Sequence, residues 1–203
     1  GFGPRYTCGP MARTREIKKR MVAVKNIQRI TKTMQMIATA KFTAALARAK
    51  ATQPYTKKIR ELVAAVSSAA GDIDHPLIAG HGEKATKKEL LLVIVSDRGL
   101  CGAYNGNVLR MATQHLRESK AKGIETTLEV SGKKAVGFFR FAKIDVARRH
   151  TQFGDKPAVE EVHRLANEYM ERFTRGEYDV VRVAFMHFES NSRQRPELMQ
   201  LLP

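Results

Sequence analysis

The chain has 203 residues, of which 43% are hydrophobic, and a formal net charge of +16. Its length suits one ordinary domain with an appendage or two small domains, and no apolar run approaches the roughly 18 residues of a transmembrane helix. Cys8 and Cys101 are too few and too differently placed for a disulfide framework, which favours a reducing intracellular compartment. The composition therefore excludes a membrane-spanning protein and a disulfide-stapled secreted domain.

Positive charge is concentrated in the first part of the chain. Residues 1–60 contain 15 Lys and Arg against one acid, Glu16, whereas the rest contains 21 basic and 19 acidic residues. Like charges one helical turn apart destabilise a helix, so a negatively charged partner explains the excess better than a solvated face. The partner could be nucleic acid, a membrane surface or an acidic protein that surrounds this part of the chain, and the composition does not choose among them.

Residues 14–71 are predicted to form one long helix, because Gly71 is its first glycine and Pro54 its only proline. Thr14 is expected to be the N-cap, with Glu16 in the first turn. Gly71 is expected to end the helix. Pro54 predicts a kink or a short break, because proline removes a backbone donor and clashes with the preceding turn.

Apolar residues recur along this helix in steps of three or four and form a narrow seam. The seam consists of Ile17, Met21, Val24, Ile27, Ile30, Met34 and Ile37. Between residues 38 and 51 the helix becomes rich in alanine, which permits close approach of a second helix. At about 1.5 Å per residue such a helix is about 80 Å long, so it projects beyond any small domain, and its seam requires a partner helix.

The rest of the chain is predicted to be an α/β domain at residues 89–203, reached through a connecting loop at residues 72–88. The expected elements are a buried strand at 90–95, a helix at 107–122, a strand at 125–131, a helix at 133–141, a short strand at 144–149, a helix at 157–175 and a strand at 178–188. Strands that alternate with helices predict a parallel or mostly parallel α/β sheet. The final residues, 189–203, are interpreted as a polar tail that turns apolar.

The helix at residues 157–175 is strongly amphipathic. Its buried side is expected to consist of Val159, Val162, Leu165, Tyr169, Met170 and Phe173.

Residues 96–105 (SDRGLCGAYN) follow the first strand, where α/β sheets often bind phosphate. The glycine spacing fits neither GxGxxG nor GxxxxGK[ST], and no acid follows the second strand in the ribose-reading position. A tight strand-to-helix turn is therefore favoured over a nucleotide site. Cys101 is expected to be a buried structural thiol, because the sequence pairs no base with it. The six histidines lack metal-binding spacing, so neither a metal nor a cofactor is expected.

Several stretches resemble one family closely. They are residues 11–20 (MARTREIKKR), 25–41 (KNIQRITKTMQMIATAK), 95–105 (VSDRGLCGAYN) and 196–203 (PELMQLLP). From Met11 onward the sequence resembles the gamma subunit of F-type ATP synthases. The resemblance implies an α/β protein whose long N-terminal helix is half of an antiparallel coiled coil, followed by a Rossmann-like domain. Met11 is the expected natural start, with residues 1–13 as a leader or unstructured start.

By this resemblance the chain is a rotor shaft that couples proton flow through the membrane ring to ATP synthesis in the catalytic head, with no catalytic residue or cofactor of its own. The implied partners are the alpha and beta subunits, the epsilon (or delta) subunit and the membrane c-ring, and no nucleic acid. The implied location is peripheral, on the cytoplasmic side of the bacterial plasma membrane or the matrix side of the mitochondrial inner membrane. The family continues through a C-terminal helix, so this sequence is expected to be a fragment or to receive that helix from elsewhere.

The resemblance also implies individual contacts. Arg29, Lys32 and Met34 are the implied contacts with the alpha/beta head, and ordinary seam packing is the alternative for Met34. The turn contributes family-marking residues with no further role. They are Asp97, Arg98, Gly99, Cys101, Gly102 and Asn105.

Two other function classes stay open. One is a basic helical arm that binds nucleic acid with an affinity that falls steeply with salt concentration. The apolar seam and the scarcity of aromatic residues on the long helix argue against it. The other is an α/β enzyme that uses a nucleotide, which would depend on the turn at residues 96–105.

Overall fold

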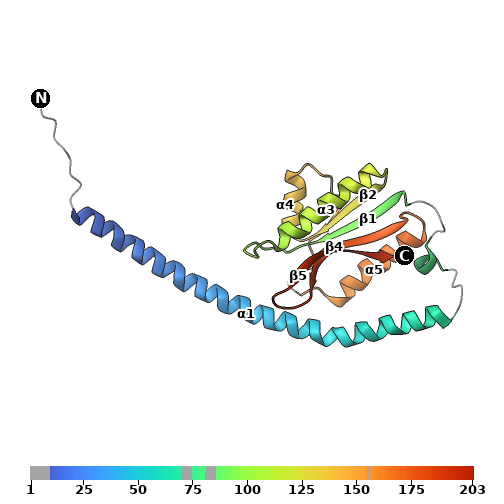
Figure 1. Cartoon of the computed structure of the whole chain (residues 1–203), viewed down its shortest axis with the longest axis horizontal. Coiled ribbons are helices and arrows are strands. Elements are labelled where there is room, and N and C mark those ends of the chain that lie inside the picture. Colours follow the sequence, from blue (N-terminus) through green and yellow to red (C-terminus); the bar gives the residue numbers. More distant parts are fainter. Residues whose placement is uncertain (1–9, 70–74, 81–85, 155) are drawn as a thin grey trace, which may run out of the picture. The chain divides into compact units, whose positions relative to one another are not determined.

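The computed structural model describes residues 10–69, 75–80, 86–154 and 156–203, and its chain divides into two compact units, Gly1–Gly71 and Asp72–Pro203. The described residues of the first unit form one helix, α1 (Pro10–Ala69) (Figure 1). The expected start at Thr14 is wrong by four residues. Proline is favourable in a first helical turn, where its missing N–H has no partner to lose. The expected end at Gly71, most of the leader and parts of the 72–88 loop lie outside the described residues.

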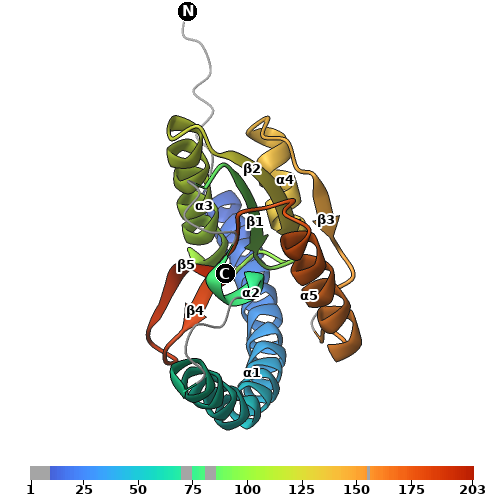
Figure 2. The same cartoon turned by 90° about the vertical axis from the view of Figure 1, so that its right-hand side faces the viewer.

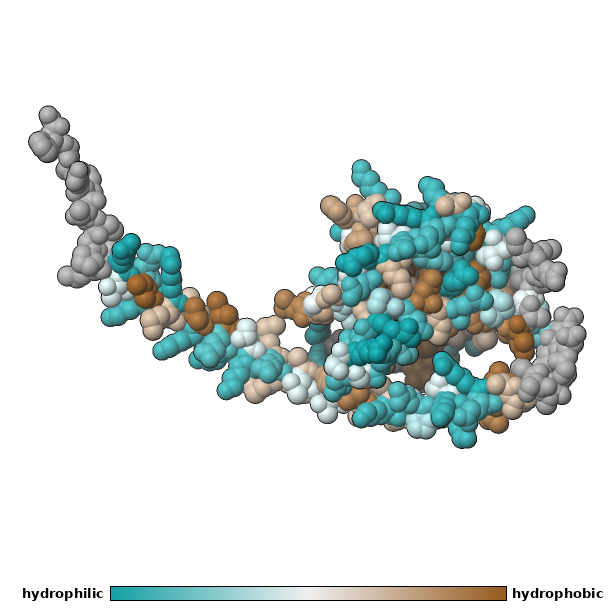
Figure 3. Space-filling model, viewed as in Figure 1, coloured by the Kyte–Doolittle hydropathy of each residue, from teal (hydrophilic) through white to brown (hydrophobic). Residues whose placement is uncertain are grey.

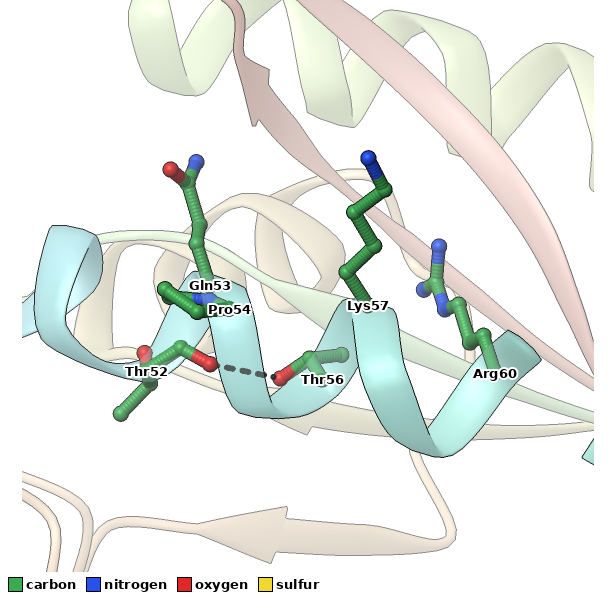
Figure 4. Close-up of a pocket in the computed structure, with 6 residues that line it drawn as sticks. All are labelled: Thr52, Gln53, Pro54, Thr56, Lys57 and Arg60. Carbon is green, nitrogen blue, oxygen red and sulfur yellow. Dashed lines mark hydrogen bonds between the residues drawn. The ribbon is translucent and has the colours of Figure 1, made fainter. Parts of the chain in front are cut away.

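Helix α1 continues through Pro54, so of the two expected outcomes, a kink or a short break, the break is wrong. The hydroxyl of Thr56 donates to the carbonyl of Thr52 at 3.1 Å (Figure 4). The hydroxyl of Thr52 donates to the carbonyl of Arg48 at 3.3 Å. Proline removes only one backbone bond, and the ladder on both sides of it propagates cooperatively. The helix therefore curves through this stretch instead of ending there (Figure 1).

The second unit is built on a five-stranded sheet with the order β3-β2-β1-β4-β5. Its strands are β1 (Lys88–Ile94), β2 (Glu125–Ser131), β3 (Arg148–His150), β4 (Val180–Phe188) and β5 (Gln194–Leu202). The first four are parallel, and β5 is antiparallel to β4. The predicted long helix and mostly parallel Rossmann-like sheet are confirmed, but the reading of residues 189–203 as a tail is wrong, because β5 forms there. Pro196 is tolerated in β5 because this is an edge strand.

Four helices accompany the sheet in the described part of this unit. They are α2 (Pro76–Ala79), α3 (Tyr104–Ala121), α4 (Lys133–Phe141) and α5 (Val159–Thr174). Helices α3 and α4 cover one face of the sheet and α5 covers the other (Figures 1 and 2). Helix α2 lies inside the expected 72–88 loop, and α3 begins three residues earlier than expected.

Strand β1 is buried on both faces, as its continuous apolar run predicts. Leu91 and Val93 pack in the cluster that contains Phe139 of α4. Leu90 packs in the opposite cluster, with Phe173 of α5. The core of this unit therefore consists of two layers separated by the sheet.

The expected burial along α5 is partly wrong. Tyr169 and Phe173 are buried, whereas Val159 and Val162 are 63% and 45% exposed. The edge strand β3 beside them has only three residues, so the first turns of α5 have little sheet to pack against.

A buried glutamate on β1 holds α3 to the sheet. The carboxylate of Glu89 is fully buried and lies 2.7 Å from Nε2 of His115. It also accepts hydrogen bonds from the hydroxyl of Ser119 at 3.0 Å and from Nη1 of Arg182 at 2.8 Å. Burial alone would raise the pKa of Glu89, but the bonds from His115 and Arg182 outweigh it and lower the pKa to about 2.

Glu129 of β2 has the same role on the opposite face. Its carboxylate lies 2.7 Å from Nε2 of His150 and accepts hydrogen bonds from the Tyr169 hydroxyl at 2.7 Å and from Nη1 of Arg172 at 3.1 Å. Burial would raise the pKa of Glu129, but these partners lower it to about 2. Burial and the Glu129 charge raise the pKa of Tyr169.

Candidate partner-binding site

The apolar seam of α1 is exposed to solvent. Exposed fractions of its side chains run from 46% for Met34 to 63% for Val24. Figure 3 shows apolar residues in brown between hydrophilic ones along this helix. Each large apolar side chain left in water forgoes about 1.5–3 kcal/mol of burial. The seam therefore has the character of a helix-pairing surface.

The seam winds around α1 instead of following a straight line. At about 100° per residue, Ile17, Met21 and Val24 lie within about 60° of one another, and so do Ile30 and Met34 with Ile37. The two groups are separated by successive steps of three residues, each of which falls about 60° short of a full turn. Such a step of three in a coiled coil overwinds it locally. Met34 thus lies within the seam.

The three implied head contacts do not share one face of α1. Arg29 precedes Met34 by five residues and lies about 140° from it around the helix axis. Lys32 precedes Met34 by two residues and lies about 160° from it. A surface that contacts both basic residues therefore leaves Met34 on the far side of the helix, among the seam residues.

Basic side chains cover the remainder of α1. The helix carries 14 Lys and Arg and two acids, Glu16 and Glu61. Glu16 pairs with Arg20 at 2.5 Å, and Glu61 pairs with Lys58 at 2.9 Å. These two carboxylates can neutralise only the cations beside them, so most of the positive charge faces solvent.

One group of polar side chains lies on a single side of α1 near Pro54. Figure 4 shows Gln53, Lys57 and Arg60 pointing the same way from successive turns. Their spacing of three and four residues explains the shared direction. This side of the helix favours an acidic partner over an apolar one.

The turn at residues 96–105 is a closed hydrogen-bond network centred on Asn105. The Asn105 amide oxygen accepts from the backbone N–H of Ser96 at 3.0 Å, and its amide nitrogen donates to the carbonyl of Arg98 at 3.3 Å. The Asp97 carboxylate accepts from the backbone N–H of Lys133 at 2.9 Å, which joins the turn to α4. These bonds support the expected structural turn between β1 and α3.

Two residues of the turn, Cys101 and Leu100, have an exposure that the sequence did not predict. Cys101 is exposed, so its expected burial is wrong; its sulfur lies 3.2 Å from the amide nitrogen of Asn105. Leu100 is 93% exposed and has a positive φ of 61°, a conformation that leucine rarely adopts. The local network, not core packing, decides both positions. The spacing of the glycines predicts a turn here, but it does not predict where the side chains of Cys101 and Leu100 point.

The described part of the chain holds no group of three His, Cys, Asp or Glu side chains arranged to bind a metal ion. Within those same residues, no helix combines the length and the hydropathy needed to cross a bilayer.

Comparison with known proteins gives the family. A model of the ATP synthase family, ATP-synt, matches residues 13–203. The chain belongs to this family. ATP synthase gamma chains from Leptospira biflexa and Rhodopirellula baltica are 40% and 35% identical to it over 193 residues, or 95% of the chain. The resemblance to the gamma subunit is confirmed. The chain spans 66% and 64% of the lengths of these two relatives.

Solved structures resemble this ATP synthase family member in fold. A chain of the Tetrahymena thermophila mitochondrial ATP synthase central stalk and c-ring aligns with a TM-score of 0.62 and 20% identity, over 86% of this chain and 72% of that one. A chain of the Euglena gracilis mitochondrial ATP synthase rotor aligns with a TM-score of 0.56 and 18% identity, over 93% of this chain and 62% of that one. Both likenesses agree with a fold of one long helix and a mostly parallel α/β sheet.

Proposed function

We propose that this chain is the central rotor-shaft, or gamma, subunit of a proton-translocating F-type ATP synthase. It would couple proton flow through the membrane ring to ATP synthesis in the alpha/beta head by rotation, as a non-catalytic part of the complex. The observation that carries the proposal is the 193-residue similarity to ATP synthase gamma chains. The exposed seam of α1 supports it, because a shaft needs a helix that pairs along its length.

We assign the mechanical roles by segment. Helix α1 forms the shaft, the segment between α1 and β1, which includes α2, connects it, and the chain from β1 onward forms the α/β domain. The seam binds the second helix of the shaft. Arg29 and Lys32 meet the alpha/beta head through charge, while Met34 packs in the seam.

The proposed partners are the alpha and beta subunits, the epsilon (or delta) subunit and the membrane c-ring. The two structural neighbours belong to a central stalk with a c-ring and to a rotor, which supports the same context for this chain. The chain would be peripheral to the membrane, on the cytoplasmic side in a bacterium or on the matrix side in a mitochondrion. The alternative of a basic arm that binds nucleic acid gains nothing from the comparisons.

A hybrid subunit tests the proposal. Residues 13–203 are joined to the C-terminal part of the Leptospira biflexa gamma chain and produced with the alpha and beta subunits of that organism. The hybrid is expected to enter the alpha/beta head and to rotate when ATP is hydrolysed. A hybrid that folds but stays outside the head, under conditions in which the full Leptospira gamma chain assembles, would refute the proposal.

A further inference from the structure

A groove of about 550 Å³ follows one side of α3, next to α4. It is lined by Gly106, Arg110, Thr113, Gln114, Arg117 and Phe138. The α3 residues recur in steps of three and four, so they lie on one face of that helix. From Gly106 to Arg117 the groove is about 16 Å long, or about three helical turns.

The groove is positively charged. Arg110 and Arg117 are exposed and lie two turns apart, and no acidic residue is among the described lining residues. The nearest acid along α3, Glu118, accepts a hydrogen bond from the side-chain amide of Gln114 at 2.9 Å. An anionic group that entered the groove would therefore meet two guanidinium groups at a fixed separation.

The charge extends beyond the groove to the whole α3 and α4 face. These two helices carry six cations and one acid, whereas α5 on the opposite face carries four acids and two arginines. The near-neutral total charge of residues 61–203 thus hides a polarised domain. Opposite fields on two faces favour one orientation of a charged partner.

Aromatic side chains make the groove apolar on its α4 side. Phe138 is 36% exposed, and its ring packs edge-on against buried Phe139 at a centroid distance of 5.3 Å. Phe141 lies one turn further along the same side of α4 and is 89% exposed. A ring held by a buried neighbour offers a rigid contact surface, which lowers the ordering cost of binding.

We propose that this groove docks an acidic, amphipathic helix of a protein partner. A helix laid along α3 can place carboxylates seven residues apart against Arg110 and Arg117, because both helices share the same rise per residue. Its apolar side covers Phe138 and Phe141, in the manner of a helix-in-groove complex. Nucleic acid could contact the arginines through its phosphates. It does not repeat its charges at the spacing of residues on an α-helix, and it would leave Phe138 and Phe141 exposed to water. The inference does not depend on the proposed rotor function.

The test uses the full chain and a short synthetic helical peptide with leucine on one side and glutamate on the other. Because basic α1 also exposes apolar residues, the peptide carries a spin label and its position is read from NMR line broadening. We expect broadening of the backbone amides of residues 106–117. Arg110→Glu with Arg117→Glu should abolish this broadening and weaken binding at the groove by about tenfold or more.

Two matched controls separate the groove from general effects. Lys120→Glu with Lys122→Glu changes the net charge equally, beside the groove, and should leave the broadening in place. Gly106→Trp fills the groove without a charge change, because a Cβ at Gly106 meets no atom within 4 Å; it should block binding. Gly154→Trp, also in open space and away from the groove, should not.

Three results would overturn the proposal. The first is an absence of broadening at residues 106–117 with the unmodified chain. The second is an equal loss of binding in both charge-reversal variants, which would indicate a diffuse field instead of a site. The third is displacement of the peptide from these residues by a short DNA or RNA duplex that binds more tightly, which would assign the groove to nucleic acid.

Discussion

The carboxylate of Glu129 on β2 lies 2.7 Å from Nε2 of His150 on β3, and both side chains are almost fully buried. Strand β3 has only three residues, so its backbone ladder contributes little to its position. Tyr169 and Arg172 of α5 bind the same carboxylate. Glu129 therefore fastens both the edge strand and the helix on that face.

Replacing this carboxylate tests its structural role. We expect Glu129→Gln to lower the free energy of unfolding by about 3 kcal/mol, because Arg172 loses its buried counter-charge. Urea unfolding followed by circular dichroism measures the change. Glu125→Gln, at the exposed start of β2, should change stability by less than about 0.5 kcal/mol. Equal effects of the two variants would contradict the role of Glu129.

The two buried carboxylates predict acid sensitivity. The pKa values of Glu89 and Glu129 fall from 4.5 to about 2 in the folded state. A lowered folded pKa gives stability that is present above the unfolded value and is lost as pH falls through the folded one. Stability should therefore hold above pH 4.5 and fall between pH 4.5 and about 2, by about 3 kcal/mol per carboxylate. Unfolding at several pH values should show a shallower fall for Glu129→Gln; an identical pH dependence would contradict the linkage.

Gly132 predicts a strong steric effect. It precedes α4 with a φ of 101°, and an added Cβ would lie 2.2 Å from the carbonyl oxygen of Val95. Gly132→Ala should destabilise the domain by about 2 kcal/mol or more. Gly137→Ala, within α4 and in open space, should stabilise by about 0.5–1 kcal/mol. Thermal melts of both variants decide this, and a neutral Gly132→Ala would show that the turn can relax.

Sequence pattern predicted the parts of the fold that have a strong period. Strand β1 is a continuous apolar run because both of its faces are buried, and α1 has an uninterrupted helical spacing. Strand β3 is too short for any period to show, and β5 mixes polar residues with leucine because it is an edge strand. The buried glutamates could not be foreseen, because their partners are distant in sequence, as Arg182 is from Glu89.

Some parts of the candidate site could be predicted from the sequence and others could not. The seam was predictable because it depends on spacing along one helix. The split between Arg29, Lys32 and Met34 follows from helical geometry as well, once the three are placed on one continuous helix. The exposure of Cys101 and Leu100 was not predictable, because hydrogen bonds from Asn105 and its neighbours set the path of the turn.

Met34 is proposed to pack in the seam. We expect Met34→Lys to weaken binding of a C-terminal shaft helix by about 1.5–3 kcal/mol, because it removes a buried apolar contact. Lys32→Ala, about 160° away around the helix, should leave this binding nearly unchanged. Titration with a peptide of the C-terminal helix of the Leptospira biflexa gamma chain measures both. A larger loss for Lys32→Ala than for Met34→Lys would place the pairing surface on the other side.

Amide hydrogen exchange along α1 tests the central claim that its seam is a helix-pairing surface. In the isolated monomeric chain, residues 14–50 should exchange much faster than Leu91 and Val93 of the buried strand β1, because the seam is exposed and like charges repel. Addition of the C-terminal helix should protect them. If the isolated chain already protects residues 14–50 as strongly as β1, or if the added helix changes nothing, the seam is not a pairing surface.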